Sequence, residues 1–544
     1  MSKSLARTIY SILILTLSLS CTQTNPPSPT QSAMPLPTLS SSQPPLTYDG
    51  SNTLDLVSHL PAPHWDVHLT PSNVLASWGP GIVYSRLLRF RSGSSIKSPS
   101  MLTECDLCTS WQQLDPVTYL FTIREDAFWH DTAPVSGRPV TGKDIEFSYT
   151  RQSTPGYPNA PLLESIKTVE AKNTGTVRIT LNAPDADFLA KIASGYSKIV
   201  AHDAVAVNGH LKEGPVIGSG PWIWKGTGDG LGYVFESNPN YFEKGLPATE
   251  RLNIHVITDE QTRVAAFQLG KLDILEAPSN ILAKLEKDNQ NISTLLYRES
   301  GTGLELSLKS NAAPLDNLQM RKAIFNAMDP WTAIDSFWNG LGFVSLGMPV
   351  ISEDWLLDEQ ELKNYLANPT KTTEFLSEGT QGLSPTFTLS IADYGDEYLA
   401  YGKYVAEELA TFGFNISTKI ITQKDYPQDI WYGGNYEAFI GPMAPITTPN
   451  MYMYSVLHSR GAWNTHGYGN GDLDSLIEQQ AIAMDVSIRK ELATQIQKHV
   501  MDKATRFMPV SKVSAWVSRP SIKNFHPTLA SAEYLYLAHI GVLD

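Results

Sequence analysis

Residues 254–275, IHVITDEQTRVAAFQLGKLDIL, contain the pattern that decides the fold class. The first four residues, Ile254-His255-Val256-Ile257, are rich in β-branched side chains and predict a strand. Leu272-Asp273-Ile274-Leu275 predicts a second strand after a gap of helix length. A strand–helix–strand unit is the building block of an α/β layer, so the segment predicts an α/β fold.

The gap between the two strands has the start and stop signals of a helix. Thr258, followed by Gln261 three residues later, matches a capping box. A helical stripe of apolar residues comes next, at Val264, Phe267 and Leu269. Gly270 stands where such a helix would end.

Strand and helix signals alternate along the rest of the chain. Residues 118–124 predict a strand, and an apolar residue at every fourth position predicts a core-facing helix at Ile488, Leu492, Ile496 and Val500. The Gly-rich run 226–232 lacks dinucleotide-binding spacing and predicts a hairpin loop. About 500 residues exceed what one hydrophobic core holds, so we expect two or three domains.

A series of short motifs, in order across nearly the whole chain, resembles the bacterial solute-binding proteins of the peptide/nickel uptake family, family 5. The motifs are Ser110-Trp111, Tyr119-Leu120-Phe121-Thr122-Ile123-Arg124, Phe128-Trp129-His130-Asp131, Val140-Thr141-Gly142-Lys143-Asp144-Ile145, Gly218-Ser219-Gly220-Pro221-Trp222, Asn238-Pro239-Asn240-Tyr241-Phe242, Gly270-Lys271-Leu272-Asp273-Ile274, Met320-Arg321-Lys322-Ala323-Ile324, Ala327-Met328-Asp329 and Tyr468-Gly469-Asn470. Each motif is weak alone, and their shared order makes the resemblance specific.

The resemblance implies a type II periplasmic-binding-protein fold with two lobes, a ligand cleft and three domains. Domain I would comprise 46–89, 206–305 and 507–544, domain II 90–205, and domain III 306–506. The implied mechanism is capture of a solute, closure about a hinge, and delivery to an ABC permease driven by ATPase subunits.

Most motif residues are predicted to be scaffold. Gly218 and Gly220 suit tight turns with positive φ. Asp144 can cap the helix that follows it, and Arg321 is expected in a helix that faces its own core or a hinge.

The N-terminal segment has the features of an export signal. Lys3 and Arg7 precede an apolar run at 9–19, and small Ser20 precedes Cys21. The run is too short for a stable membrane span, which needs about 20 residues. Residues 1–21 are therefore predicted to be a signal peptide ending at a lipobox, with Cys21 as the lipidation site. Residues 22–45 are rich in Pro and Ser and predict a disordered tether, so we expect an exported, membrane-anchored lipoprotein.

The chain has three cysteines, and lipidation of Cys21 leaves Cys105 and Cys108. In an exported protein such an even remainder favours a local disulfide, although two free thiols stay possible. A single Cys-Asp-Leu-Cys is a weak metal motif, because zinc usually has two such pairs or added histidines.

Charge and motifs exclude several function classes. The formal net charge is −14, which argues against nucleic acid as a partner. No nucleophile elbow, phosphate-binding loop or metalloprotease helix is present, so we predict no catalytic residues and no cofactor. The rival prediction, an exported hydrolase using the same cleft, lacks such a constellation.

Two groups of histidines could in principle bind a metal. His59, His64 and His68 lie close in sequence, and His458 and His466 flank Trp463. Pro61 and Pro63 interrupt the first group, so surface or satisfied buried histidines are favoured and no metal site is predicted. A receptor for nickel or a metal chelate on the same fold remains the alternative.

The candidate binding site lies in the loop 442–449, which follows a predicted strand at 437–441. Ligands of α/β domains favour the crevice beyond strand ends. The residues we select are Met443, Pro445, Thr447, Asp393, Tyr394 and Trp463.

The resemblance implies that the loop 442–449 lines the cleft and carries an Asp that pairs with a peptide's ammonium group. This loop has no carboxylate. We therefore expect ordinary peptides to bind weakly, unless Asp393 or Asp396 supplies the charge from the opposite wall. The sequence predicts a monomeric receptor for a peptide or other small solute, with the exact ligand open.

Overall fold

The structure is a computed structural model that describes residues 52–228, 232–288, 291–380, 384–528 and 532–543. The chain divides into residues 1–45 and a compact unit of residues 46–544. The predicted signal peptide, Cys21 and the tether lie outside the described residues. No helix among the described residues is long and apolar enough to cross a membrane.

Two four-stranded sheets and a hydrophobic core shared by both form a first lobe. The first sheet has the order β1 (Thr53–Ser58), β10 (Arg251–Val256), β9 (Gly232–Ser237) and β8 (Trp222–Thr227). The second has the order β4 (Cys108–Asp115), β5 (Thr118–Ile123), β7 (Thr176–Leu181) and β6 (Ile166–Asn173). The strand predicted at 118–124 is confirmed as β5.

Short helices and strand pairs complete the first lobe. They are α1 (Asn73–Ser77), α2 (Gly142–Gln152), α3 (Phe188–Ala193), α4 (His202–Ala206), β2 (Leu88–Phe90) with β3 (Thr103–Cys105), and β18 (Ile522–Lys523) with β19 (Gly541–Val542). The core that these elements share runs from Leu54 to Ile540, so the two ends of the described chain meet in one lobe.

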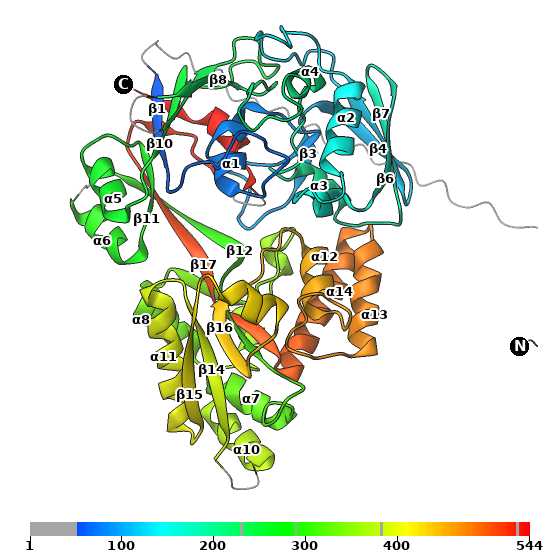
Figure 1. The fold of residues 1–544 in the computed structure, drawn as a ribbon. Helices are drawn as coiled ribbons and strands as arrows, with labels where there is room; N and C mark the ends of the chain where they lie inside the picture. Colours follow the sequence, from blue (N-terminus) through cyan, green and yellow to red (C-terminus); the bar gives the residue numbers. More distant parts are fainter. Residues whose placement is uncertain (1–51, 229–231, 289–290, 381–383, 529–531, 544) are drawn as a thin grey trace, which may run out of the picture. The chain divides into compact units, whose positions relative to one another are not determined.

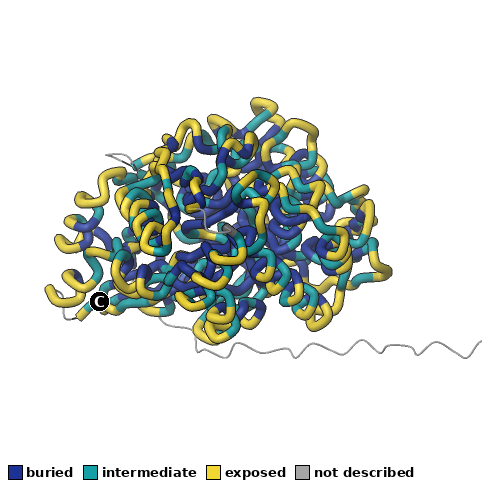
Figure 2. Tube along the Cα trace, turned by 90° about the horizontal axis from the view of Figure 1, so that it is seen from below, coloured by how far each residue is buried: buried dark blue, intermediate teal, exposed yellow. Residues whose placement is uncertain are grey.

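A seven-stranded sheet organises the second lobe. Its order is β11 (Ile274–Ala277), β17 (Arg506–Ser518), β12 (Ser293–Leu308), β16 (Ala438–Pro442), β14 (Thr386–Asp393) and β15 (Asn415–Thr422), with β13 (Gly342–Ser345) paired to β17. The principal helices are α7 (Leu318–Ala327), α8 (Pro330–Trp338), α9 (Glu359–Leu362), α10 (Pro369–Thr380), α11 (Asp396–Thr411), α12 (Pro449–Tyr452), α13 (Gly471–Ile482) and α14 (Val486–Lys503). In Figure 2 the stretches of trace coloured as buried lie in the interior, and those coloured as exposed lie on the outer turns.

The long strands β12 and β17 join the two lobes (Figure 1). Tyr297 and Trp516 pack in the core of the first lobe, whereas Leu304 and Phe507 pack in that of the second. The predicted domain boundary after residue 305 falls inside β12, near this change of core. The division into three domains stays a prediction.

The strand–helix–strand unit at 254–275 exists, but its two strands belong to different sheets. β10 lies in the first four-stranded sheet and β11 at the edge of the seven-stranded sheet. The helix between them, α5 (Glu260–Gln268), packs with α6 (Ser279–Asp288) and β11 in a small separate core. The unit therefore agrees with the expected α/β fold without forming one sheet, because local pattern does not specify which sheet a strand joins.

Several local predictions also need correction. Asp259, and not Thr258, caps α5 by accepting a hydrogen bond from the Thr262 amide. Thr141 is the N-cap of α2, and Asp144 is the third helical residue of its capping box, accepting from the Thr141 amide.

Gly218 and Gly220 have no positive φ, contrary to prediction. Both are required by close packing, because a Cβ on Gly218 would lie 1.8 Å from the carbonyl oxygen of Val83, and one on Gly220 would lie 2.8 Å from it.

The predicted amphipathic helix is confirmed as α14, although its buried face is shifted at the start. Ile496 and Val500 are buried, but Ile488 is exposed and Arg489 is buried in its place. Arg321 faces the core as predicted and donates hydrogen bonds to the backbone carbonyls of Leu315 and Asp316.

Candidate functional site: a cleft between two cores

Two adjoining cavities lie where β12 and β17 pass from one core to the other. Their volumes are about 570 Å³ for cavity 1 and about 430 Å³ for cavity 2. Both are lined by Asn73, Glu299, Thr302, Gly303, Tyr398 and Ala532, so they form one continuous cleft. A combined space of this size fits a small solute of several residues or a comparable molecule.

The register of β17 turns a polar row toward cavity 1. Lys512, Ser514 and Trp516 alternate along the strand and therefore point to the same face. Trp516 pairs with Glu276 of β11, and this pairing places the Glu276 side chain beside the same row. All four residues line cavity 1.

A bulge in β12 brings Glu299 to the cleft. Arg298 pairs with Val513 of β17, and Gly303 pairs with Ser511. The four residues 299–302 of β12 therefore lie opposite the single residue Lys512 of β17. Gly303 has a φ of 146°, and a Cβ there would lie 2.1 Å from the Val510 carbonyl oxygen. Glycine is therefore required where the bulge rejoins the ladder.

Two carboxylates that line cavity 1 share one ammonium group. The Lys512 Nζ lies 2.6 Å from Glu276 Oε1 and 3.4 Å from Glu299 Oε1. The Ser514 hydroxyl donates to Glu276 Oε1 at 2.8 Å and also contacts Glu299. Burial would raise the pKa of Glu276, but Lys512 and Ser514 hold that pKa below its usual value. The two carboxylates raise the pKa of Lys512 despite its burial.

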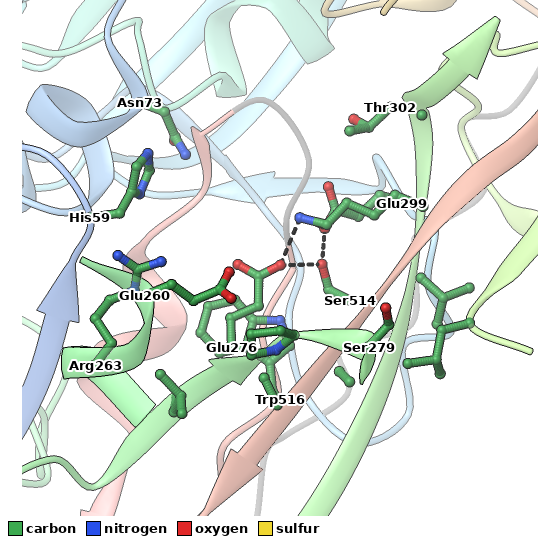
Figure 3. A pocket seen from close by; sticks show the side chains of 18 of the residues that line it. His59, Asn73, Glu260, Arg263, Glu276, Ser279, Glu299, Thr302, Ser514 and Trp516 are labelled. Atoms are coloured by element: carbon green, nitrogen blue, oxygen red, sulfur yellow. Dashed lines mark hydrogen bonds and ion pairs between the residues drawn. The ribbon is translucent and has the colours of Figure 1, made fainter. Parts of the chain in front are cut away.

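Negative charge exceeds positive charge around cavity 1. Its lining includes the four carboxylates of Glu260, Glu276, Glu299 and Glu397, against the cations of Arg263 and Lys512. Figure 3 shows Glu260 and Glu276 directed into the same space.

A fifth lining carboxylate, Glu533, is neutralised within the protein. Arg86 donates to its two oxygens at 2.7 and 2.8 Å, and both side chains are buried. With Glu533 set aside, cavity 1 carries two net negative charges when His59 is neutral. Burial and the nearby Arg263 lower the pKa of His59, which favours that neutral form.

An aromatic pair forms part of the wall of cavity 1. The rings of Trp78 and Trp516 stack with centroids 5.8 Å apart and planes within 5° of parallel. Trp516 is 7% exposed, and its Nε1 has no hydrogen-bond partner among the described residues. A buried donor without a partner is costly in a folded protein, so it is available to a ligand acceptor.

The predicted binding loop lines cavity 2. Residues 442–447, including the selected Met443, Pro445 and Thr447, face that cavity. The loop begins at the end of β16, where Tyr426 Oη and Trp431 Nε1 both donate to the Pro442 carbonyl oxygen. The strand prediction at 437–441 is confirmed by β16, and the contact of this loop with solute stays a prediction.

The other three selected residues line neither cavity of the cleft. Asp393 ends β14, where it pairs with Thr422 of β15. Tyr394 packs against Tyr398 and Tyr426. Trp463 packs against the core of the second lobe. Tyr398 of α11, four residues after Tyr394, does reach both cavities and was missed.

The histidines do not come together as a metal centre. His68 is fully buried, its Nε2 lies 2.9 Å from the Lys198 carbonyl oxygen, and burial lowers its pKa to about 4. His458 and His466 are buried and line neither cavity, whereas His59 lines cavity 1. Within the described ranges no three His, Cys, Asp or Glu residues are grouped as metal ligands.

The sequence contained signals for the missed cleft residues. The Glu299-Ser300-Gly301-Thr302-Gly303 stretch interrupts a strand pattern with two glycines, which is a bulge signal. Lys512 and Ser514 alternate with apolar residues in β17, which is typical of a strand with one polar face. Their meeting with Glu276 depends on pairing between distant strands and has no local signal.

Cys105 and Cys108 form a disulfide in the structure, with the two Sγ atoms 1.94 Å apart. The bond connects the end of β3 to the start of β4 and lies in the first lobe, outside the lining of the cleft. Its role is therefore structural.

Residues 103–464 match the family described as bacterial extracellular solute-binding proteins, family 5. The chain belongs to this family. The match covers most of the chain and includes the loop of cavity 2 and the bulge of β12.

Several known proteins resemble the chain over most of its length. Heme-binding protein A of Haemophilus influenzae is 24% identical over 472 residues, covering 81% of this chain and 84% of that protein. Di/tripeptide-binding protein 1 of Pseudomonas aeruginosa is 24% identical over 479 residues, covering 82% and 85%. The structure of the ABC transporter substrate-binding protein CtaP of Listeria monocytogenes is 18% identical, covers 91% of this chain and all of that chain, and superposes with a TM-score of 0.76.

These results confirm the expected fold and the general role. The protein is a mixed α/β solute-binding protein of an ABC transporter, acts outside the cytoplasm, and belongs to a non-enzymatic family. The relatives carry names for different solutes, heme and short peptides, so family membership alone leaves the solute open.

Proposed function

We propose that this family 5 protein captures a peptide or peptide-like solute in the cleft and delivers it to the permease of a peptide importer. The observation that carries the proposal is the continuous cleft formed by cavities 1 and 2. One half has charged groups and hydrogen-bond donors, and the other half has the apolar residues Met443, Pro445 and Ile446. A peptide offers both kinds of surface within a short length.

The lobes give the mechanism of capture. β12 and β17 link the two cores directly beside the cleft. A change in the backbone at the β12 bulge would therefore open or close the cleft. Hinge closure around a solute is the usual motion of two-lobed receptors. The chain supplies binding and closure, and no covalent step.

We therefore propose, against the expectation from the loop alone, that ordinary peptides bind. That expectation rested on the absence of a carboxylate from the loop 442–449, and Asp393 does not line the cleft. The cleft instead receives carboxylates from β11 and from the bulge of β12, through Glu276 and Glu299. An ammonium group therefore has partners on a different wall.

Ligand recovery tests the proposal most directly. Protein purified without unfolding should release peptides when it is denatured, and mass spectrometry of the released fraction identifies them. Calorimetry with a tripeptide library should then show saturable binding. Recovery of a metal chelate or another non-peptide solute, with no library binding, would contradict the proposal.

A steric variant locates the binding in the cleft. Thr447→Trp places a large side chain at cavity 2 and should weaken library binding about tenfold or more. Thr418→Trp makes the same change at an exposed position on β15 and should leave binding unchanged. Equal effects of the two variants would place the binding elsewhere.

The alternative, a receptor for nickel or a metal chelate, has less support from the site. Only His59 among the five histidines considered lines the cleft, and its own neighbours include the cation of Arg263. Recovery of metal with the purified protein would favour it.

We also infer that the mature chain is a lipoprotein attached to a membrane through Cys21, with residues 22–45 as its tether. Cys21→Ser should move the protein from the membrane to the soluble fraction. Unchanged sedimentation with membranes would contradict the anchor.

A further inference from the structure

We propose that Glu276 and Glu299 together bind a positively charged group of the solute, a primary ammonium or a guanidinium, in cavity 1. In the unliganded protein Lys512 holds the two carboxylates in position. The inference rests on the proposed function and adds the orientation of the solute, with its cationic end in cavity 1 and its remainder in cavity 2.

The geometry leaves part of each carboxylate available. Lys512 and Ser514 contact Oε1 of both Glu276 and Glu299, so these contacts do not use Oε2 of either residue. The Glu276 side chain is 40% exposed and that of Glu299 is 17% exposed, on the cavity that both line. A carboxylate has about four acceptor sites, and these two therefore retain capacity for a second cation.

The charge balance favours a cation over an anion. One Lys512 cannot neutralise two carboxylates, and Glu260 adds a further negative charge to the same space. An entering ammonium or guanidinium would reduce this repulsion, whereas an entering carboxylate would increase it. A low-dielectric cleft strengthens both effects.

A second observation points to a ligand at the same place. Trp516 lines cavity 1, is more than nine-tenths buried, and has an Nε1–H without a partner among the described residues. Its ring stacks on Trp78 and gives the wall an aromatic face, a surface that also attracts cations. A solute with a hydrogen-bond acceptor close to its cationic group, such as the N-terminal residue of a peptide, fits both features.

The test compares one tripeptide library with the same library acetylated at the amine, using calorimetry at neutral pH. The wild-type protein should bind the free-amine library at least about tenfold more tightly. Glu276→Gln and Glu299→Gln should remove most of this preference and change binding of the acetylated library little.

Two further variants make the test specific. Glu236→Gln removes an exposed carboxylate that pairs with Lys225 outside both cavities of the cleft, and it should preserve the preference. Lys512→Met removes the internal cation and should tighten binding of the free-amine library, the opposite sign from the Glu variants. Thermal unfolding without ligand checks that each variant is folded.

The outcomes separate the two proposals. Equal binding of both libraries by the wild type would overturn the cation site and leave the peptide proposal standing. A preference that survives both Glu276→Gln and Glu299→Gln would assign the cation to other residues and also overturn the inference. Binding of neither library would overturn the peptide proposal, and the cation site for peptides with it.

Discussion

Two charged groups near the junction of the lobes differ in how completely the protein satisfies them. In one, Arg489 of α14 forms an ion pair with Asp187, the residue that precedes α3 in the first lobe. Arg489 also donates to the Ala186 carbonyl oxygen and to Gln480, and the amide of Asn450 donates to Asp187 at 2.7 Å. Asp187 is 0% exposed and Arg489 is 4% exposed.

The second contact is the Glu276–Lys512–Glu299 group in cavity 1. Its side chains are between 17% and 44% exposed, and its charges do not cancel. In the Arg489–Asp187 pair, burial would raise the pKa of Asp187, yet Arg489 keeps that pKa below its usual value. Both members of that pair therefore carry their charges. The difference indicates a division of roles: the sealed and balanced pair holds the lobes together, whereas the open and unbalanced group is available to a solute.

Breaking the sealed pair should have the largest effect on stability. Arg489→Met leaves the buried Asp187 without its cation, and removal of one partner of a buried pair costs about 3–5 kcal/mol. Urea unfolding measures this loss. Lys490→Met is the matched control, because Lys490 pairs with Asp354 at an exposed site and such pairs contribute about 0–1 kcal/mol. Similar losses for the two variants would contradict the distinction.

The disulfide between Cys105 and Cys108 flanks a buried carboxylate of the first lobe, Asp106. Asp106 lies between the two cysteines, is fully buried, and accepts a hydrogen bond from the Arg86 amide at 2.8 Å. Replacement of Cys105 and Cys108 by Ser should cost at most about 2 kcal/mol, because the closed loop is very short.

Thiol labelling gives the direct check of that bond. In the unfolded, unreduced protein neither Cys105 nor Cys108 should react, and both should react after reduction. Labelling of both before reduction would show that the disulfide does not form.

Glu408 of α11 is a third kind of carboxylate, partly buried and with no ion pair to a described residue. Burial, with a contribution from the charge of Asp329, raises its pKa to about 7, and its Oε2 has no hydrogen-bond partner among the described residues. A folded-state pKa above the unfolded value means that the folded protein holds this proton more tightly. Its contribution to stability is therefore full below about pH 4.5, falls as the pH rises toward 7, and stays lost above that.

Glu408→Gln should remove this pH dependence. The variant should gain about 1 kcal/mol over the wild type at pH 8 and nothing at pH 4.5, measured by urea unfolding at both pH values. Glu407→Gln, at an exposed neighbour that pairs with Lys403, should show no such difference. A gain that is equal at the two pH values would contradict the assignment to Glu408.

The smallest expected change in stability belongs to the open group. Glu276→Gln removes one charge from a group with an excess of negative charge and keeps a hydrogen-bond acceptor for Ser514. The free energy of unfolding without ligand should change by less than about 1 kcal/mol. A loss of unfolding free energy as large as that of Arg489→Met would show that the Glu276–Lys512–Glu299 group stabilises the fold and is not kept available to bind solute.

Elements with a complete local pattern were predictable. The strand β5 and the helix α14 lie where the residue pattern placed them, and β8 and β9, which flank the Gly-rich run, pair as antiparallel strands. The ordered motifs carried the family and the fold, and the loop after β16 was found because it follows a strand end. These features depend on residues close together in the chain.

The helix caps and the start of α14 show where local patterns fail. Thr258 and Asp259 are adjacent residues that can both cap a helix, and the cap is Asp259 because α5 begins at Glu260. Ile488 continues the apolar stripe of α14 but is exposed, because contact with the first lobe turns Arg489 inward at that end.

The sequence by itself determined an α/β receptor of family 5, its strands and helices, and one wall of the cleft. Only the tertiary structure decided the charge of the cleft, because Glu276, Glu299 and Lys512 come from three strands separated by up to 236 residues of chain. Strand pairing and a bulge bring them together, and each of these depends on contacts with other strands. The same holds for Asp187 and Arg489, whose pairing requires both lobes to be folded and in contact.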